Sequence, residues 1–406
     1  MSVRKPWSTV VMLGIAQTLA WGSSYYLPAM LAAPMARELG IAPSTVFAAF
    51  SAALIVSAAF GPWAGRAIDR FGGRPVLIAS NLVFACGLAA IGQVQNTTQL
   101  FLAWALLGVA MGCGLYEAAF ATVVRLQGQG ARGAITGITL IAGFASTVGW
   151  PLSAALEAQF GWRDTCLAWA GLHLVLGLPL NLFLPSVRRA SADAAYAAEP
   201  TPAIGAGPSM SVAQARRAAV LMAYVFAVAW FISTAMAAHL PQVLQAAGVG
   251  FAVAVSAAAL VGPAQVAGRV LEFSVLQRLH PLLSARLATL AHPLGALALL
   301  TVGAPAAFAF AVLHGMGNGI LTIAIGTLPL LLFGATGYGQ RQGWLMVPAR
   351  LVQAGAPFLF GLGLERWNAN ALWATAALSL SACVALWWLK APALDAAAPE
   401  AAPPLR

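Results

Sequence analysis

Charged residues are scarce in this chain: Asp, Glu, Lys and Arg make up 8% of its 406 residues, whereas a soluble domain carries roughly 25%. So few charges cannot cover a water-facing surface, and most of the outer surface must therefore face lipid. The sequence has no P-loop and no G-x-G-x-x-G turn, which argues against ATP-driven and hydride chemistry. It also has no paired acids or His-rich clusters. We therefore expect no enzymatic activity and no cofactor.

Cysteine is almost as rare, and the four cysteines all fall in apolar stretches without a C-x-x-C pair. No metal or redox site is predicted from that spacing. The formal net charge is +10, which in a soluble protein would suggest a nucleic-acid partner. Here the basic residues punctuate apolar runs, so they are expected to mark loops at a membrane surface, and no nucleic-acid partner is predicted.

What the chain does have is long apolar runs, and hydrophobic residues make up 61% of it. A lipid bilayer leaves helices and closed barrels as spanning structures, and unbroken runs favour helices over the short alternating segments of a barrel. The pattern predicts an all-α membrane protein with twelve transmembrane helices, each of about 20 residues or more. The predicted spans are 9–35, 45–66, 74–94, 98–124, 133–157, 163–184, 217–240, 250–276, 284–303, 306–333, 343–363 and 369–389.

The basic residues are distributed unevenly when the loops are assigned alternately to the two sides of the membrane. Of the 21 Lys and Arg residues, only Arg37, Arg163 and Arg366 fall on one side. Apart from Arg269 and Arg350, which lie inside spans, all others fall on the opposite side. Positively charged loops remain in the cytoplasm, so both termini are predicted to be cytoplasmic. Frequent Ala and more Arg than Lys suggest a GC-rich bacterial genome, and hence a cell inner membrane.

A segment rich in Ala, Pro, Gly and Ser separates two groups of six predicted spans. Such a composition cannot bury a core and predicts a flexible cytoplasmic linker. An Ala-Trp pair recurs in the first span of each group, at Ala20-Trp21 and Ala229-Trp230. These observations predict two pseudo-symmetric six-helix halves with a substrate site between them. The predicted divisions are 1–185 and 217–390 for the halves, 186–216 for the linker, and 391–406 for a disordered tail.

The loop between the second and third spans carries G-P-W-A-G-R-A-I-D-R-F-G-G-R at residues 61–74. In pattern and position this run resembles the signature loop of the major facilitator superfamily, G-x-x-x-D-R-x-G-x-R. Gly65 allows helices to approach closely, Gly72 permits a tight turn, and Asp69 can accept hydrogen bonds from a helix N-terminus. Arg70 and Arg74 are expected to pair with Asp69 and hold the cytoplasmic side shut. The resemblance implies a secondary transporter of the major facilitator fold.

Two patterns of drug–proton antiporters are poorly met. Trp104 stands where those proteins carry an Arg four residues before Gly108, and residues 149–154 read G-W-P-L-S-A in place of G-P-x-x-G-G. The fifth span instead has a looser resemblance to the monocarboxylate and oxalate–formate transporter group, through R-G-A-I-T-G at 132–137 and the later Gly143, Gly149, Pro151 and Gly161-Trp162-Arg163.

Glu117 lies inside the span 98–124, where a charged residue costs about 2.5–3.5 kcal/mol on insertion scales. A carboxyl group shielded from water can hold a proton at neutral pH. Glu117 is therefore predicted to couple transport to protons or to contact the substrate. The alternative is a structural Glu that bonds to a neighbouring helix or lines water.

Arg269 lies inside the span 250–276. The resemblance to monocarboxylate transporters implies that an Arg at this place binds the substrate carboxylate. Those proteins also have an Asp four residues earlier, where this chain has Gln265, so Glu272 is the candidate replacement partner at i+3. The alternative is that Arg269 only gates the pathway.

Arg350 lies inside the span 343–363, either as a second cationic anchor in the cavity or as a residue that snorkels to the cytoplasmic interface. Trp21 and Tyr25 are one helical turn apart and are predicted to line the substrate cavity. His314 and Asn318 share a face by the same spacing, which forms either part of the cavity or a hydrogen-bonded packing seam. We expect His292 to be structural.

The sequence therefore predicts a proton-coupled carrier whose two halves rock around a central cavity. Its expected partners are a small-molecule substrate, most simply an organic anion, together with the proton and the lipid bilayer. The carrier is expected to act as a monomer. The alternatives are a proton-driven multidrug or metabolite exporter and a non-transporting membrane sensor built on the same fold.

Overall fold

The computed structural model describes residues 6–186, 210–276 and 279–389, and these residues form helices and no strand. The first helices are α1 (Pro6–Ser23), α2 (Leu27–Leu39), α3 (Pro43–Phe71), α4 (Gly73–Gly92), α5 (Thr97–Gly114), α6 (Tyr116–Gln127), η1 (Gly128–Ala131), α7 (Arg132–Ala142), α8 (Ala145–Leu172), η2 (His173–Gly177) and α9 (Leu178–Leu182). The later helices are α11 (Val212–Ala246), α12 (Phe251–Ala259), α13 (Val261–Ser274), α14 (Pro281–Val302), η4 (Ala304–Ala306), α15 (Ala307–Phe333), α16 (Tyr338–Trp367), η5 (Asn368–Asn370) and α17 (Ala371–Trp388).

Several predicted spans are broken inside their predicted range. The first span contains α1 and α2, the fourth contains α5 and α6, and the eighth contains α12 and α13. The break between α5 and α6 falls at Leu115, which has an extended backbone and is fully buried. Irregular backbone at membrane depth is tolerated where protein covers it. Two of these breaks lie at predicted site residues, because Tyr25 lies at one and Glu117 is two residues after Leu115.

Eight helical stretches within the described residues are long and apolar enough to cross a membrane. One of them, Thr97–Leu182, has 86 residues and would measure about 130 Å as one straight helix, against a hydrocarbon core of about 30 Å. It therefore crosses more than once, and its helix is sharply redirected at Gly161, where φ is 80°. Eight is thus not the number of crossings, and the number twelve stays a prediction.

Buried apolar side chains form two clusters. The first contains residues from Val10 to Leu184 together with Leu330 and Tyr338, and the second contains residues from Ala218 to Leu389. Most of the predicted linker and the whole predicted tail lie outside the described residues, so the bounds of the halves stay predictions. Ser211 and Gln214 form a capping box that starts α11 at Val212, within the last residues of the predicted linker.

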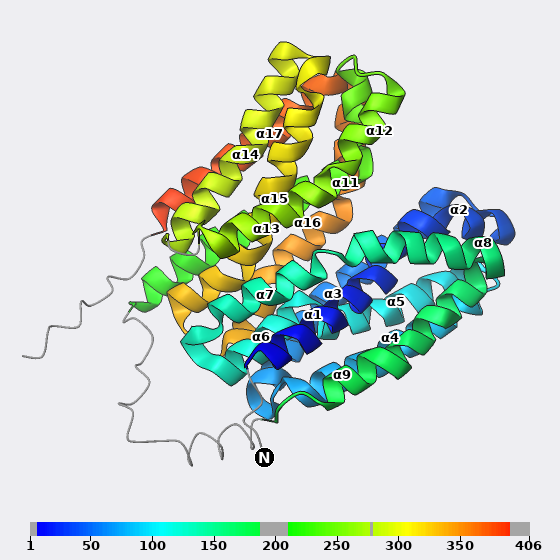
Figure 1. The fold of residues 1–406 in the computed structure, drawn as a ribbon, viewed down its shortest axis with the longest axis vertical. Coiled ribbons are helices and arrows are strands. Elements are labelled where there is room, and N and C mark those ends of the chain that lie inside the picture. The colour runs from blue at the N-terminus through cyan, green and yellow to red at the C-terminus, as the bar shows by residue number, and fades with distance from the viewer. Residues whose placement is uncertain (1–5, 187–209, 277–278, 390–406) are drawn as a thin grey trace, which may run out of the picture.

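The two groups of helices pack together at one end of the bundle and diverge toward the other (Figure 1). At the packed end α3 lies along α16, and α7 contacts both α13 and α15. At the opposite end, α2 and α8 point away from α12 (Figure 1). We call these the closed end and the splayed end.

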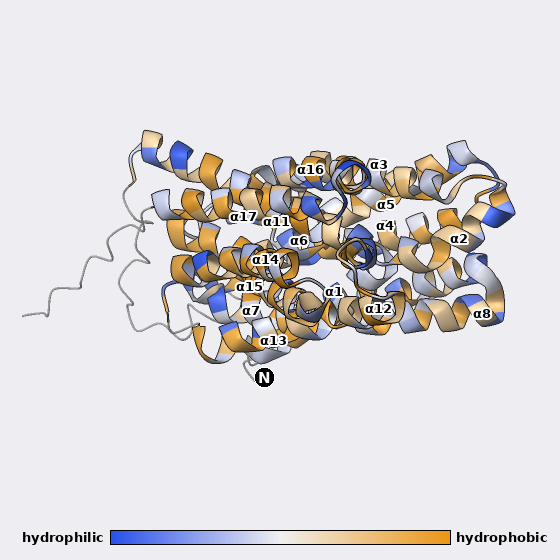
Figure 2. Ribbon diagram, turned by 90° about the horizontal axis from the view of Figure 1, so that it is seen from above, coloured by the Kyte–Doolittle hydropathy of each residue, from blue (hydrophilic) through white to orange (hydrophobic). Residues whose placement is uncertain are grey.

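The outer surface is apolar. Figure 2 shows hydrophobic residues along most of the helices and hydrophilic residues near several helix ends. Large side chains such as Val175, Phe358 and Trp387 are strongly exposed. A surface of this kind suits a lipid environment and not water.

Candidate functional site

An ion pair between the two groups of helices lies at the centre of the candidate site. Nη2 of Arg350, on α16, donates a hydrogen bond of 2.9 Å to Oε1 of Glu117, on α6. The side chains are only 3% and 14% exposed, respectively. Glu117 lies in the first turn of α6 because the helix restarts after Leu115, and a carboxylate is favoured at a helix N-terminus. The sequence predicted both residues as functional candidates but not that they pair.

A chain of hydrogen bonds continues from this ion pair. Nη1 of Arg350 donates to Oε1 of Gln353 at 3.0 Å, and Nε2 of Gln353 donates to the hydroxyl of Tyr25 at 3.2 Å. The Tyr25 hydroxyl lies 3.3 Å from the hydroxyl of Thr234 on α11. Gln353 and Thr234 were not predicted from the sequence, although Gln353 is three residues after Arg350 and thus on the same helix face.

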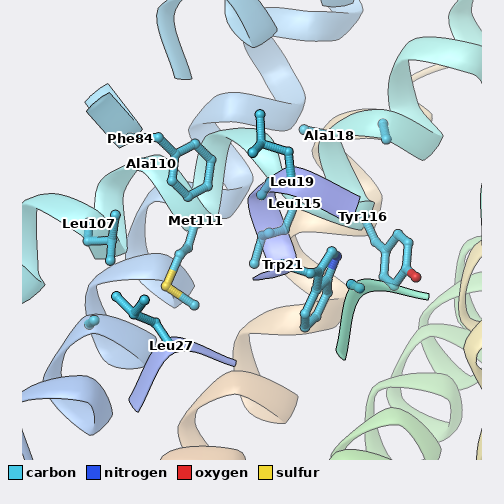
Figure 3. Close-up of a cluster of buried hydrophobic side chains, with 14 of the residues drawn as sticks. Leu19, Trp21, Leu27, Phe84, Leu107, Ala110, Met111, Leu115, Tyr116 and Ala118 are labelled. Carbon is cyan, nitrogen blue, oxygen red and sulfur yellow. The ribbon is translucent and has the colours of Figure 1, made fainter. Parts of the chain in front are cut away.

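The recurring Ala-Trp pairs of the sequence meet in this site. The rings of Trp21 and Trp230 stack at a centroid distance of 6.0 Å and an angle of 2°. The guanidinium of Arg350 lies 5.0 Å from the Trp230 ring and 5.9 Å from the Trp21 ring, within the range of cation–π attraction. The ring centroids of Trp21 and Tyr116 are 4.9 Å apart, and the two side chains are neighbours in Figure 3.

Both stacked tryptophans have a buried indole N–H without a hydrogen-bond partner. Buried Trp N–H groups usually find a partner, so these are two unused donors beside a paired Arg and Glu. Two stacked aromatic rings with free donors are suited to a planar molecule that carries an acceptor.

Arg269, on α13, is buried at 5% exposure. Within the described part of the chain its guanidinium makes no hydrogen bond or ion pair, and its Nε is fully shielded without a partner. It lies against α7, where a Cβ atom added at Gly143 would collide with Nη1 of Arg269. A buried and unpaired positive charge is unfavourable, so this guanidinium can bind an anion strongly.

The prediction that Glu272 pairs with Arg269 is wrong. Glu272 instead accepts a hydrogen bond of 3.1 Å from Nη2 of Arg132, which is on α7. The i+3 spacing places Glu272 near Arg269 on the surface of α13. Glu272 nevertheless pairs with Arg132, because α7 of the other group packs against α13 and brings Arg132 within reach. This second ion pair joins the groups near the closed end.

Asp69 caps the N-terminus of α16 at the closed end. Its Oδ1 accepts from the backbone N–H of Gly339 at 2.9 Å, and its Oδ2 accepts from that of Gln340 at 2.8 Å. These N–H groups belong to the first helical turn, where they have no partner inside the helix and the helix dipole favours an anion. Gly72 ends α3 with φ 84°, a conformation that favours glycine.

Arg70 and Arg74 do not pair with Asp69 in the described structure. Arg70 instead lies over the ring of Phe71, with 5.0 Å between the guanidinium carbon and the ring centroid. The three ion pairs among the described residues involve other side chains. The pairing prediction therefore fails because the backbone of α16 already satisfies both carboxylate oxygens.

Neither Arg350 nor Arg269 lines the cavity that contains His314 and Asn318. This small cavity of ≈ 20 Å³ lies between α11, α14, α15 and α17, inside the second group of helices. Nδ1 of His314 is 3.1 Å from Nδ1 of His292, and Nδ2 of Asn318 donates to the hydroxyl of Ser233 at 3.1 Å. The remaining predicted substrate residues, Trp21 and Tyr25, do not line this cavity either.

Comparison with known proteins identifies the fold and the family. A family model described as Major Facilitator Superfamily matches residues 13–305. The chain is similar to the 4-hydroxybenzoate transporter PcaK of Pseudomonas putida, with 31% identity over 165 residues, which are 39% of this chain and 36% of that protein. It is similar to the multidrug resistance protein MdtH of Aeromonas hydrophila, with 25% identity over 159 residues, which are 39% and 40% of the two chains.

A third relative is the multidrug resistance protein fnx1 of Schizosaccharomyces pombe, 32% identical over 115 residues, which are 28% of this chain and 21% of that protein. The chain therefore matches these relatives over less than half of their length. Among solved structures, the proton:xylose symporter XylE has a TM-score of 0.70 at 13% identity and covers 94% of this chain and 95% of its own.

Two further solved structures share the fold over nearly their whole length. FucP in the outward conformation has a TM-score of 0.70 at 13% identity, covering 93% of this chain and 97% of its own. The human organic anion transporter MFSD10 has a TM-score of 0.63 at 16% identity, and the match covers 95% of this chain and 100% of that chain.

Proposed function

Because this chain belongs to the Major Facilitator Superfamily, we propose that it carries a small organic anion across the membrane together with protons, by alternating access. Membership makes it a membrane transporter and not an enzyme. The observation that carries the choice of substrate is Arg269, a buried guanidinium without a protein counter-charge among the described residues. A guanidinium binds a carboxylate through two parallel N–H···O bonds, which makes a carboxylate the best-fitting ligand.

The pair of Glu117 and Arg350 supports proton coupling. An ionised Glu117 holds Arg350 across the contact between the two groups of helices. A proton added to Glu117 removes one charge of that pair and releases the guanidinium, either for a substrate anion or for separation of the groups. Coupling of this kind needs a carboxylate that binds either a neighbouring cation or a proton. Glu117 meets this requirement because it pairs with Arg350.

The conformation supports alternating access. The closed end carries the Asp69 contact and the loop with Arg66, Arg70 and Arg74, and this charge distribution supports a cytoplasmic location for that end. The splayed end then faces outward, as in the outward conformation of FucP. We extend the proposal to twelve spans, two halves over 1–185 and 217–390, cytoplasmic termini, an inner-membrane location and a monomeric carrier.

The relatives support the substrate class in part. One is named a 4-hydroxybenzoate transporter and one solved structure an organic anion transporter. Two others are named multidrug resistance proteins, and the stacked Trp21 and Trp230 also suit a flat lipophilic compound. A multidrug or metabolite exporter is therefore the second candidate function.

A ligand panel tests the choice. The purified protein in detergent is heated with aliphatic carboxylates, aromatic carboxylates including 4-hydroxybenzoate, their methyl esters, and lipophilic cations. We expect stabilisation by at least one carboxylate and none by its ester, because the ester has lost the charge that Arg269 binds. Equal stabilisation by esters or cations would replace the anion proposal by the exporter.

A further inference from the structure

A histidine in the sixth predicted span links α1 and α4 to η2. His173 begins the π-helical turn η2, and its side chain is fully buried. Its Nδ1 lies 2.9 Å from Oδ1 of Asn81 on α4, and its Nε2 lies 2.8 Å from the hydroxyl of Ser23 at the end of α1. The ring also stacks on Phe84 of α4, with 4.7 Å between the ring centroids. Single π-helical turns inside longer helices are frequent at functional sites.

The direction of these hydrogen bonds follows from a backbone carbonyl. Nδ2 of Asn81 donates to the carbonyl oxygen of Leu77 at 2.9 Å, so the atom that faces His173 is Oδ1, which can only accept. Nδ1 of His173 therefore carries a hydrogen. Within the described part of the chain His173 bonds to no carboxylate, and a charged ring at 0% exposure would be unfavourable. The ring is thus neutral, and its Nε2 accepts the hydroxyl hydrogen of Ser23.

The bonded serine lies between two residues of the candidate site. Ser23 is the last residue of α1, two residues after Trp21 and two before Tyr25. The chain turns here before α2 begins, and the N–H of Tyr26 donates to the carbonyl of Trp21 at 3.1 Å. The bond between Ser23 and His173 therefore fixes the point at which the chain turns, and with it the directions of the Trp21 and Tyr25 side chains.

Close packing around this turn leaves it little freedom. A Cβ atom added at Gly149 of α8 would lie 2.9 Å from the Cα atom of Gly22, the residue between Trp21 and Ser23. A Cβ atom added at Gly177, the last residue of η2, would collide with Oδ1 of Asn81. Tightly packed interiors transmit strain, so a change at η2 is passed on to the end of α1.

We infer that His173 is a positioning residue of the candidate site, which acts through Ser23 on Trp21 and Tyr25. Among the described residues, its own hydrogen bonds and ring contact reach none of the side chains that meet Arg350, so its effect on the site is indirect. The inference rests on the proposed function, because Trp21 and Tyr25 are predicted substrate residues.

The end of α1 also carries contacts to the second group of helices. Trp21 stacks on Trp230, and the hydroxyl of Tyr25 lies 3.3 Å from that of Thr234. Both partners are on α11. A displaced end of α1 should therefore change the surroundings of Trp230, although His173 belongs to the first group and is distant from α11 in the sequence.

Fluorine NMR tests the positioning without a ligand. The full-length protein is labelled with fluorotryptophan and reconstituted in nanodiscs, and Trp230→Phe assigns the Trp230 signal. We expect this signal to move in Ser23→Ala and in His173→Leu, because both changes remove the bond to α1. It should move less in His173→Gln, whose amide keeps a donor and an acceptor. Ser80→Ala is the matched control, since Ser80 is a buried serine whose hydroxyl donates within α4.

A double variant tests whether both residues act through one contact. His173→Leu added to Ser23→Ala should leave the Trp230 signal where Ser23→Ala alone places it. A Trp230 signal that keeps its wild-type position in the single variants, or additive displacements in the double variant, would overturn the inference. If His173→Leu does not fold, the signal in Ser23→Ala decides, because that change removes only a hydroxyl group.

Substrate binding provides a second measurement, with 4-hydroxybenzoate as the probe. Ser23→Ala should weaken its binding about fivefold, the loss expected for one buried hydrogen bond, whereas Ser80→Ala should bind it like the wild type. Equal affinities of Ser23→Ala and the wild type would remove His173 from the substrate site. If the wild type binds neither this probe nor any other carboxylate of the panel, the proposed function fails, and the Trp230 signal alone then decides whether His173 positions the end of α1.

Discussion

Gly65 of α3 and Gly339 of α16 approach so closely at the closed end that neither has space for a Cβ atom. A Cβ added at Gly65 would collide with the backbone carbonyl of Gly339, and one added at Gly339 would meet the carbonyl oxygen of Gly65. Backbone cannot move aside as a flexible side chain can. The closed end therefore depends on two glycines from opposite groups of helices, and only one of them belongs to the signature loop.

Gly65→Ala should disfavour the closed end without disturbing the rest of α3. Gly61→Ala is the matched control, because a Cβ there lies 3.9 Å from Gly343, an ordinary contact. We expect Gly65→Ala to slow transport at least tenfold and Gly61→Ala to behave like the wild type. The measurement is initial uptake at equal membrane expression. Equal rates for the two variants would show that the close approach is not needed for transport.

Asp69→Asn should slow transport strongly and leave expression nearly normal. Asn keeps one acceptor but loses the charge and the second hydrogen bond to α16, and hydrogen bonds to charged groups contribute about 1.5–3 kcal/mol. The closed end should open more often, so that a single cysteine introduced at the partly buried Ala335, which packs against the first cluster, reacts faster with a water-soluble maleimide. Unchanged reactivity and full transport together would remove Asp69 from the conformational mechanism.

Glu117→Gln should remove the dependence of uptake on pH gradients while substrate exchange continues. The change keeps the shape of the side chain but leaves Arg350 buried without a counter-charge, a loss of roughly 3–5 kcal/mol for a buried pair. A lower melting temperature is therefore expected as well. An added Arg350→Gln change should restore part of the stability, because it removes the unpaired charge. Preserved pH dependence in Glu117→Gln would make the residue structural.

Arg269→Ala should abolish binding of the carboxylate found in the ligand panel, and Arg269→Lys should weaken it, because Lys cannot form the bidentate contact. Gly143→Ala should weaken binding indirectly, since the added methyl group displaces Nη1 of Arg269. Gly133→Ala on the same helix is the control, with no atom within 4 Å of the added group. Normal binding by Arg269→Ala would exclude this guanidinium as the anion site.

The orientation is tested by labelling from outside intact cells in a cysteine-free background. Gln95 lies between α4 and α5, and Gln129 lies in η1 near the closed end; both are exposed. We expect a cysteine at position 95 to react and one at position 129 to stay unreactive until the membrane is opened. The reverse pattern would place the termini outside the cytoplasm.

The individual candidate residues could be read from the sequence, but their partners could not. Glu117 and Arg350 stood out because charges are costly inside apolar spans. Their pairing depends on how α6 and α16 meet across 233 positions of chain, which no local spacing encodes. In the same way, the spacing of Arg269 and Glu272 suggested a pair along one helix, whereas Glu272 pairs with Arg132 of another helix.

The sequence by itself determined the class of protein, since its low charge and long apolar runs permit little other than a helical membrane protein, and the loop at 61–74 indicated its family. Only the tertiary structure decided which residues work together. It paired Arg350 with Glu117, left Arg269 without a partner among the described residues, brought the two recurring tryptophans face to face, and gave Asp69 the backbone of α16 as its partner. The physical reason is that apolar patterning acts through local burial, whereas pairing of charges and hydrogen bonds depends on contacts between helices that are distant in the chain.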